Sequence, residues 1–229
     1  MLQISEIYQS IQGEGEFTGV PSVFVRTTGC NLRCWFCDTP FTSWNPEGRS
    51  QSVDQILKHV TALGIEHVVV TGGEPLLLPD IVPLTAALRS QGHFVTVETA
   101  GTVFREATAD LMSISPKLAN STPSPERSLA WSQRHEEVRH RPSVIRRLIS
   151  ESPYQFKFVI DAPIDVADVE RWLTEFSEID RSRVWLMPQA TTREELAAKT
   201  DWVEQAAETS GFRFTSRLHI QQFGNARGH

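Results

Sequence analysis

The positions of apolar and polar residues predict strands that alternate with helices along most of the chain. Runs of β-branched and aromatic residues predict strands at residues 2–9, 22–28, 67–71, 94–97, 111–114, 155–160, 184–187 and 212–220. Apolar residues at helical spacing predict helices at about residues 52–63, 80–90, 165–177 and 192–209, the first with Ser52 as its N-cap. This alternation predicts a parallel α/β sheet with right-handed crossovers, and so many units in one domain predict a barrel, complete or open.

Residues 118–150 interrupt the alternation. Proline and serine come first, followed by a run dense in Arg, His and Glu with scattered apolar residues. We interpret this segment as an insertion within a single domain of residues 1–229, with one or two helices that cover a barrel end or a subunit contact. For its arginines, a solvated charged face is the more probable interpretation. The tail at residues 221–229 is too rich in glycine to extend the last predicted strand.

Composition narrows the class of protein. With 229 residues and 40% hydrophobic side chains, the chain can bury one sizeable core. No apolar stretch approaches the length of a membrane span, and the first residues lack the basic and apolar regions of a signal peptide, so we expect a cytoplasmic protein without a membrane partner. A net charge of -6 gives no footprint for direct nucleic-acid binding. A small-molecule substrate is therefore favoured.

All three cysteines lie in one short stretch, at Cys30, Cys34 and Cys37. Three thiols cannot close an even set of disulfides, so their concentration in one loop points to a metal centre. Three thiolates on a four-iron cluster would leave one iron open to a ligand. A zinc site completed by a distant histidine, and three buried cysteines that pack as small hydrophobic residues, are the alternatives.

Other unusual residues follow predicted strands. The segments are Gly72–Gly73–Glu74–Pro75, Glu98–Thr99 and Ser115–Pro116–Lys117. In barrels of parallel strands the chemistry lies at the carboxyl ends of the strands, so we expect these segments and the cysteines at one rim. The segment Ser10–Glu16 contains two glycines that would let backbone approach a ligand, although it could be a plain hairpin-like connection.

The spacing C-x-x-x-C-x-aromatic-C, with Phe36 as the aromatic residue, resembles the cluster motif of radical S-adenosylmethionine (SAM) enzymes. The segment Gly72–Pro75 resembles the GGE/P element of the same superfamily. The resemblance implies a partial or open (β/α) barrel with mostly parallel strands and a helical insertion. It also implies a 4Fe–4S cluster on the three cysteines and SAM on the open iron. The implied SAM contacts are Phe36, Cys37, Asp38, Gly73, Glu74, Glu98, Ser115, Pro116 and Lys117, although Lys117 could equally be a surface lysine.

A narrower resemblance covers nearly the whole chain. Ile11–Gly15, Arg26, Cys37–Thr39, Glu98–Thr102, Ser115–Lys117 and Gly224–Gly228 resemble the 7-carboxy-7-deazaguanine synthase family. This implies conversion of 6-carboxy-5,6,7,8-tetrahydropterin to 7-carboxy-7-deazaguanine with loss of ammonia, in queuosine and 7-deazapurine biosynthesis. No catalytic side chain beyond the cofactor ligands is implied. The implied substrate contacts are Ile11, Gln12, Gly13, Glu14, Arg26, Thr71 and His229.

The same family likeness implies further partners. Thr39 would bind Mg²⁺ together with the substrate carboxylate, although a threonine before Pro40 could also be an N-cap. The tail would fold toward the active site, the chain would form a homodimer, and an external one-electron donor such as flavodoxin would reduce the cluster. The competing functions are a glycyl-radical-enzyme activating protein and a non-catalytic zinc or iron–sulfur protein.

Overall fold

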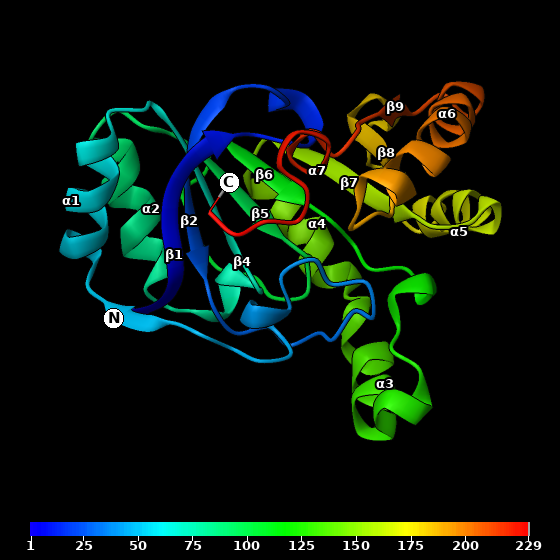
Figure 1. Ribbon diagram of the computed structural model, residues 1–229, viewed down its shortest axis with the longest axis horizontal. Coiled ribbons are helices and arrows are strands. Elements are labelled where there is room, and N and C mark those ends of the chain that lie inside the picture. The colour runs from blue at the N-terminus through cyan, green and yellow to red at the C-terminus, as the bar shows by residue number, and fades with distance from the viewer. Residues whose placement is uncertain (229) are drawn as a thin grey trace.

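The computed structural model describes residues 1–228, which form one nine-stranded sheet in the order β3–β1–β2–β4–β5–β6–β7–β8–β9 (Figure 1). From β2 to β9 each neighbouring pair is parallel, whereas β1 is antiparallel to both β2 and β3. The prediction of a mostly parallel α/β sheet is therefore confirmed. The strands are β1 (Leu2–Ile11), β2 (Pro21–Thr27), β3 (Arg49–Gln51), β4 (His67–Gly72), β5 (Phe94–Thr99), β6 (Leu111–Ile114), β7 (Tyr154–Ile160), β8 (Val184–Pro188) and β9 (Arg213–Phe214).

Helices connect the parallel strands and pack on the sheet. The helices are α1 (Val53–Leu63), α2 (Ile81–Ser90), α3 (Pro125–Arg139), α4 (Pro142–Glu151), α5 (Pro163–Leu173), α6 (Arg193–Ser210) and α7 (Leu218–Phe223). Figure 1 shows α1 and α2 beside β1, β2 and β4, and α5 and α6 beside β7 and β8. The Ser52 side chain accepts from the Gln55 N–H and the Gln55 side chain accepts from the Ser52 N–H, so the predicted N-cap of α1 is confirmed. No helix in residues 1–228 is long and apolar enough to cross a membrane.

Strand β7 shows how the sequence divides the inside of the barrel from its outer layer. Phe156 and Phe158 are fully buried and pack on Trp172 of α5, with ring centroids 5.5 and 5.2 Å apart. Lys157 and Val159 lie on the opposite face and line a cavity inside the barrel. Because successive residues of a strand point to opposite faces, the apolar residues hold the helices while their neighbours face the cavity.

Residues 118–150 contain two helices, as predicted, but the two have different positions relative to the core. Ile145 and Leu148 of α4 are buried in the main core, and α4 lies in the chain between β6 and β7, where a crossover helix belongs. Helix α3 has a mean hydropathy well below that of α4 and extends away from the sheet in Figure 1. The extra element is therefore α3, and α4 is part of the repeating α/β pattern.

The predicted strand at residues 212–220 is wrong beyond Phe214. The chain forms only the short β9 and then turns into α7. The Leu218 N–H donates to Gly13 O at 3.0 Å, and Ile220 is fully buried against Ala190 and Leu196. Tertiary contacts of α7 therefore override the β propensity of the apolar run. The short strand β3 went unpredicted because its residues, Arg49–Gln51, are polar.

Candidate active site

The predicted site residues meet at one cavity at the carboxyl ends of the parallel strands. The cavity is lined by every one of them within residues 1–228 except Glu74 and Pro116. His229 lies outside the described residues. The strand register explains the convergence, since Arg26 of β2 is paired with Thr71 of β4, and Glu98 of β5 with Ser113 of β6. Residues 45 and 15 positions apart in the sequence thus occupy neighbouring positions on the sheet.

The cysteine loop, residues 29–43, is fixed by close backbone contacts with the Gly72–Pro75 turn. Gly29 N donates to Thr42 O at 2.8 Å, and Glu74 N donates to Gly29 O at 2.9 Å. A Cβ on Gly73 would lie 2.3 Å from Gly29 O, far inside van der Waals contact. Glycine at position 73 is therefore required for the turn to pack against the start of the cysteine loop.

The three thiols have the surroundings of metal ligands. Cys30, Cys34 and Cys37 all line the cavity, and burial raises the pKa of the Cys30 and Cys34 thiols to about 12. Such thiols become thiolates only if a positive centre replaces their protons, as bound iron does. Within residues 1–228, no three His, Cys, Asp or Glu side chains are grouped tightly enough to hold a single metal ion. Three thiols around one cavity fit the three-cysteine side of a four-iron cluster.

Helix α3 and the segment before it hold the other side of the cysteine loop. The Arg33 N–H donates to His135 Nδ1 at 3.1 Å, and His135 Nε2 lies 2.9 Å from Ser121 Oγ. The Trp35 N–H donates to Ser121 O at 3.1 Å. His135 is fully buried, and burial lowers its pKa to about 4, so the ring is neutral with its proton on Nε2. The loop therefore has a fixed conformation between α3 and the Gly72–Pro75 turn.

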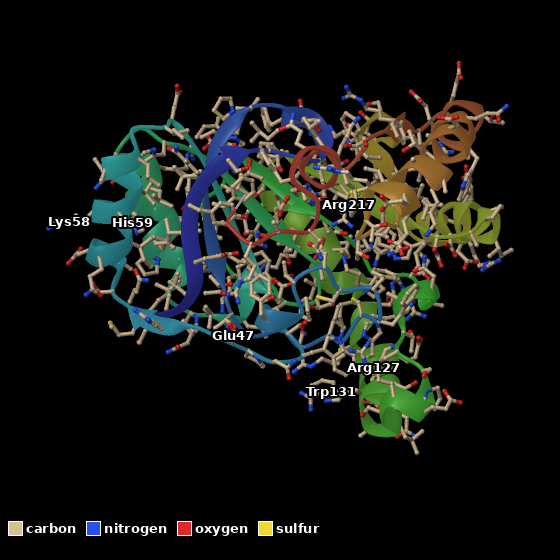
Figure 2. All side chains as sticks on the ribbon, viewed as in Figure 1. Glu47, Lys58, His59, Arg127, Trp131 and Arg217 are labelled. Atoms are coloured by element: carbon tan, nitrogen blue, oxygen red, sulfur yellow. The ribbon has the colours of Figure 1, made fainter. Side chains whose placement is uncertain are left out.

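Aromatic and arginine side chains strengthen this contact at the surface. The guanidinium of Arg33 lies 3.9 Å from the ring centroid of Trp131, and that of Arg127 lies 3.7 Å from the ring centroid of Trp44. Figure 2 shows Arg127 and Trp131 where α3 meets the cysteine loop. Each such cation–π contact at a partly exposed position contributes about 0.5–1 kcal/mol.

Glu74 ties two strand ends together beneath the cavity. Thr99 Oγ1 donates to both of its carboxylate oxygens at 2.9 Å, and the Ala100 and Leu76 N–H groups donate to it at 2.8 and 3.1 Å. The residue is fully buried. These bonds join the end of β4 to the end of β5, so within this structure Glu74 shapes the turn, and Gly72 and Gly73 are the residues of the turn that line the cavity.

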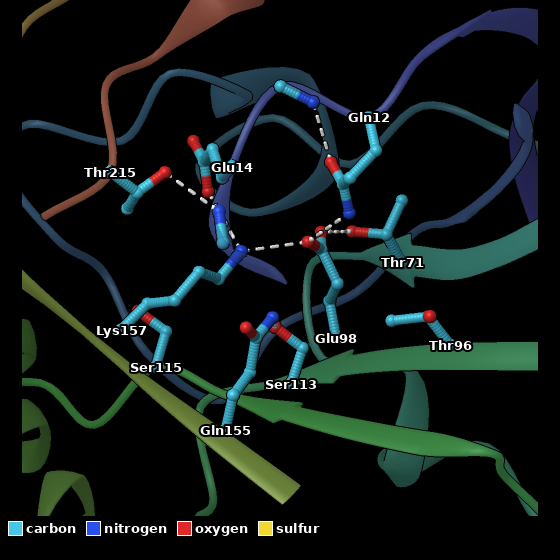
Figure 3. Close-up of polar contacts among 12 residues, drawn as sticks. Gln12, Glu14, Thr71, Thr96, Glu98, Ser113, Ser115, Gln155, Lys157 and Thr215 are labelled. Atoms are coloured by element: carbon cyan, nitrogen blue, oxygen red, sulfur yellow. Dashed lines mark hydrogen bonds and ion pairs between the residues drawn. The ribbon is translucent and has the colours of Figure 1, made fainter. Parts of the chain in front are cut away.

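Five buried or partly buried charged side chains of alternating sign are linked along the cavity lining. Arg217 pairs with Asp38 and donates through Nε to Glu14 Oε1 at 3.1 Å. Lys157 Nζ lies 2.9 Å from both Glu14 Oε2 and Glu98 Oε1 (Figure 3). Although burial opposes ionisation of Glu14 and Lys157, their mutual attraction lowers the pKa of Glu14 and raises that of Lys157. Both groups are therefore charged.

Lys157, Arg217 and His219 line the cavity and were not predicted from the sequence. The alternation Gln155–Phe156–Lys157–Phe158 was the available signal, because a charged residue between two buried aromatic residues points to a barrel interior. Glu98, predicted to contact SAM, hydrogen-bonds with Gln12 and Thr71, which were predicted to contact the substrate. The structure thus groups Glu98 with the residues of the substrate set.

Arg26 is held rigidly at one wall of the cavity. Its Nε pairs with Glu6 Oε1 at 2.8 Å, and its Nη2 donates to the Tyr8 hydroxyl. The Tyr8 ring stacks on Phe24 with centroids 5.2 Å apart. The guanidinium therefore has a fixed orientation, which suits recognition of a planar carboxylate.

The C-terminal segment closes another wall. A Cβ on Gly13 would lie 2.2 Å from His219 Nδ1, so α7 packs directly on the turn between β1 and β2. Asn225 Nδ2 donates to Asp38 O at 3.3 Å, and Arg227 pairs with Glu47 at 2.9 Å. Residues 225–227 line the cavity. Figure 2 shows Arg217 beside α7, where this segment begins.

Comparison with known proteins assigns the family. Residues 24–120 match the Radical SAM superfamily. Over 228 residues the chain is 46% identical to the 7-carboxy-7-deazaguanine synthase of Rhodopirellula baltica, covering 99% of this chain and 88% of that protein. The chain belongs to the 7-carboxy-7-deazaguanine synthase family. It is therefore a radical SAM enzyme, whose cofactors are a 4Fe–4S cluster and SAM.

Two further family members extend the comparison. The 7-carboxy-7-deazaguanine synthase of Halobacterium salinarum is 43% identical over 235 residues, with 98% of this chain and 91% of that protein covered. The crystal structure of QueE from Escherichia coli superposes with a TM-score of 0.73 at 24% identity and covers 95% of this chain and 94% of that chain. The predicted fold of the radical SAM type is thereby confirmed.

Proposed function

We propose that this enzyme converts 6-carboxy-5,6,7,8-tetrahydropterin to 7-carboxy-7-deazaguanine with release of ammonia, for queuosine or 7-deazapurine biosynthesis. The observation that carries the proposal is a single cavity lined by two chemically different sets of residues. One set is the three cysteines, and the other is Arg26, Gln12 and the Glu14–Lys157–Glu98 group. A radical source and a polar binding site for a small heterocycle are thus adjacent, as this reaction requires.

The residues around the three cysteines fit the cofactors. Cys30, Cys34 and Cys37 would hold the cluster, and Phe36, Gly73 and Ser115 would contact SAM. Lys117 Nζ donates to Ser115 O and Oγ at 2.7 and 2.8 Å, so the ammonium is held where it can meet a carboxylate. When bound, the reduced cluster and SAM supply a carbon-centred radical that removes hydrogen from the substrate. The contribution of the protein is to position that carbon and to exclude water.

The polar residues of the cavity fit the substrate. Arg26 offers a fixed fork of donors for the substrate carboxylate, and Thr39 supplies an oxygen for Mg²⁺, which keeps several waters and needs few protein ligands. Thr39 lies within the cysteine loop, and its Oγ1 is 3.8 Å from Cys37 Sγ. Backbone and side chains of Ile11, Gln12 and Gly13 offer donors and acceptors to the edge of the pterin.

The C-terminal segment would close the site. Asn225, Ala226 and Arg227 already line the cavity, so the C-terminal segment reaches the site as far as Arg227. We include in the proposal that the tail shields the radical from solvent and that the terminal His229 contacts the substrate. We also propose that the enzyme is a homodimer in the cytoplasm. An external one-electron donor such as flavodoxin would reduce its cluster.

Anaerobic turnover tests the function. The reconstituted enzyme is given the tetrahydropterin acid, SAM, dithionite and Mg²⁺, and 7-carboxy-7-deazaguanine, ammonia and 5′-deoxyadenosine are quantified. The proposal predicts product and ammonia in equal amounts with far less 5′-deoxyadenosine, because SAM is regenerated. One 5′-deoxyadenosine per activation event and no deazapurine would favour a glycyl-radical activating protein. A colourless protein with zinc and no iron or sulfide would favour the non-catalytic alternative.

A further inference from the structure

Lys157 lies behind two carboxylates in the barrel interior. Its side chain is 3% exposed, whereas those of Glu14 and Glu98 are 13% and 22% exposed. The ammonium donates to Glu14 Oε2 and Glu98 Oε1 at 2.9 Å each (Figure 3). All three residues line the cavity, but the lysine side chain is the least exposed of them. The two carboxylates are therefore more accessible to a ligand than the ammonium is.

The two carboxylates are fixed from other directions as well. Gln12 Nε2 donates to Glu98 Oε1 at 3.3 Å, and Thr71 Oγ1 donates to Glu98 Oε2 at 2.9 Å. Arg217 Nε donates to Glu14 Oε1 at 3.1 Å. Each carboxylate thus has partners on separate elements of the barrel. Because a carboxylate can accept about four hydrogen bonds, both retain acceptor capacity toward the cavity.

The charges of this group do not cancel. Its anions are Asp38, Glu14 and Glu98, and its cations are Arg217 and Lys157, so the three negative and two positive charges leave one negative charge. A partly buried surplus of negative charge favours a ligand that brings N–H donors and disfavours one that brings further acceptors. Loss of Lys157 would add a second uncompensated charge.

We infer that Lys157 is a positioning residue that holds Glu14 and Glu98 ionised and in place to accept hydrogen bonds from the 2-amino and ring N–H groups of the pterin. This inference rests on the proposed function, which supplies the pterin. The lysine itself does not touch the substrate. Both neighbouring carboxylates raise its pKa, so it keeps its proton and acts only through the two acceptors.

Binding by the anaerobic, cluster-loaded enzyme with SAM tests this role. Affinity is measured by calorimetry for the tetrahydropterin acid and for an analogue with hydrogen in place of the 2-amino group. The variants are Lys157→Met, Lys157→Arg and, as a matched control, Lys199→Met. Lys199 also bridges two oxygen acceptors, Asp161 and Gln189, but does not line the cavity. SAM cleavage without substrate is recorded for each variant, as a check that the cluster and SAM sites around the cysteines are intact.

Lys157→Met is expected to weaken binding of the tetrahydropterin acid by roughly 10–100-fold, the range for one or two charge-assisted hydrogen bonds, and to change binding of the analogue less than about threefold. Lys157→Arg should recover most of the affinity, and Lys199→Met should bind as the wild type does. Equal losses for both compounds in Lys157→Met would overturn the inference. If Lys157→Met does not fold, Glu98→Gln is measured in its place. It should bind the tetrahydropterin acid more weakly and the analogue nearly as the wild type does. Equal losses of affinity for both compounds would again overturn the inference. Failure of the wild type to bind the tetrahydropterin acid would instead refute the proposed function.

Discussion

The backbone N–H of Arg33 donates to Nδ1 of His135 at 3.1 Å, which joins the cysteine loop to helix α3. The other ring nitrogen lies 2.9 Å from Ser121 Oγ, and Ser121 Oγ donates to Leu118 O at 2.7 Å. A single buried imidazole therefore transmits the position of residues 118–121 to the loop that carries the three cysteines. The extra helix of this chain thus supports the candidate cluster site directly.

Removal of this imidazole should weaken cluster retention. His135→Ala leaves the Arg33 N–H without its acceptor in a buried position, which costs about 1–3 kcal/mol in the free energy of unfolding. We expect lower iron and sulfide content after reconstitution and a lower midpoint in denaturant unfolding. His59→Ala, an exposed histidine on α1, is the control and should match the wild type. Equal iron content in both variants would contradict this role of His135.

Acid should destabilise the fold through the same residue. Burial lowers the pKa of His135 to about 4 from the ordinary 6.5. Between these values the unfolded chain binds a proton that the folded chain does not, so the free energy of unfolding falls as the pH falls from 6.5 to 4, by on the order of 3 kcal/mol. His135→Gln keeps an acceptor and cannot titrate. Denaturant unfolding at pH 7, 5.5 and 4.5 should therefore show a steeper loss for the wild type, whereas parallel losses would refute the assignment.

Close packing at Gly73 gives a second test of the cysteine loop. A Cβ at this position would lie 2.3 Å from Gly29 O, so Gly73→Ala must displace the loop or the turn. We expect loss of most of the bound iron. Gly64→Ala provides the matched control, because Gly64 ends α1 at φ 67 and an alanine there costs about 1–2 kcal/mol without touching the loop. The control should unfold earlier yet keep its cluster; the same iron loss in both would show that general instability is the cause.

The fold was predictable where strong local patterns coincide with tertiary structure. The apolar run His67–Thr71 is a strand because both of its faces are buried, and Ser52 begins α1 because its own turn supplies the capping partners. The run at residues 212–220 likewise contains apolar residues that favour a strand. Its outcome depended on Gly13 O, which lies some 200 residues earlier in the sequence and accepts from Leu218.

Some residues of the site could likewise be predicted from the sequence, and others could not. Cysteines 30, 34 and 37 were predictable because their spacing is itself the signal. The role of Lys157 and Arg217 becomes apparent from their hydrogen bonds to Glu14, which is 143 and 203 residues away along the chain. Single basic residues in a sequence are usually solvated, so local reasoning has no cause to select them. Only the strand register and the position of α7 bring them to the cavity.

Magnesium dependence should separate Thr39 from the cluster ligands. Thr39→Ala removes a hydroxyl oxygen from the cysteine loop and leaves the thiols in place. We expect reconstitution with normal iron content, normal SAM cleavage without substrate, and product formation reduced roughly 10-fold or more with little response to added Mg²⁺. Thr61→Ala on α1 is the control and should respond to Mg²⁺ as the wild type does. A Thr39→Ala enzyme with wild-type magnesium stimulation would exclude Thr39 as a ligand.

The three cysteines of one loop are expected to hold a four-iron cluster with one iron open to SAM. Electron paramagnetic resonance of the anaerobically reconstituted and reduced enzyme, recorded with and without SAM, tests this directly. We predict the signal of a reduced 4Fe–4S cluster that shifts when SAM is added, and no such signal in Cys34→Ala. A cluster signal that SAM leaves unchanged, or one that survives in Cys34→Ala, would contradict the account.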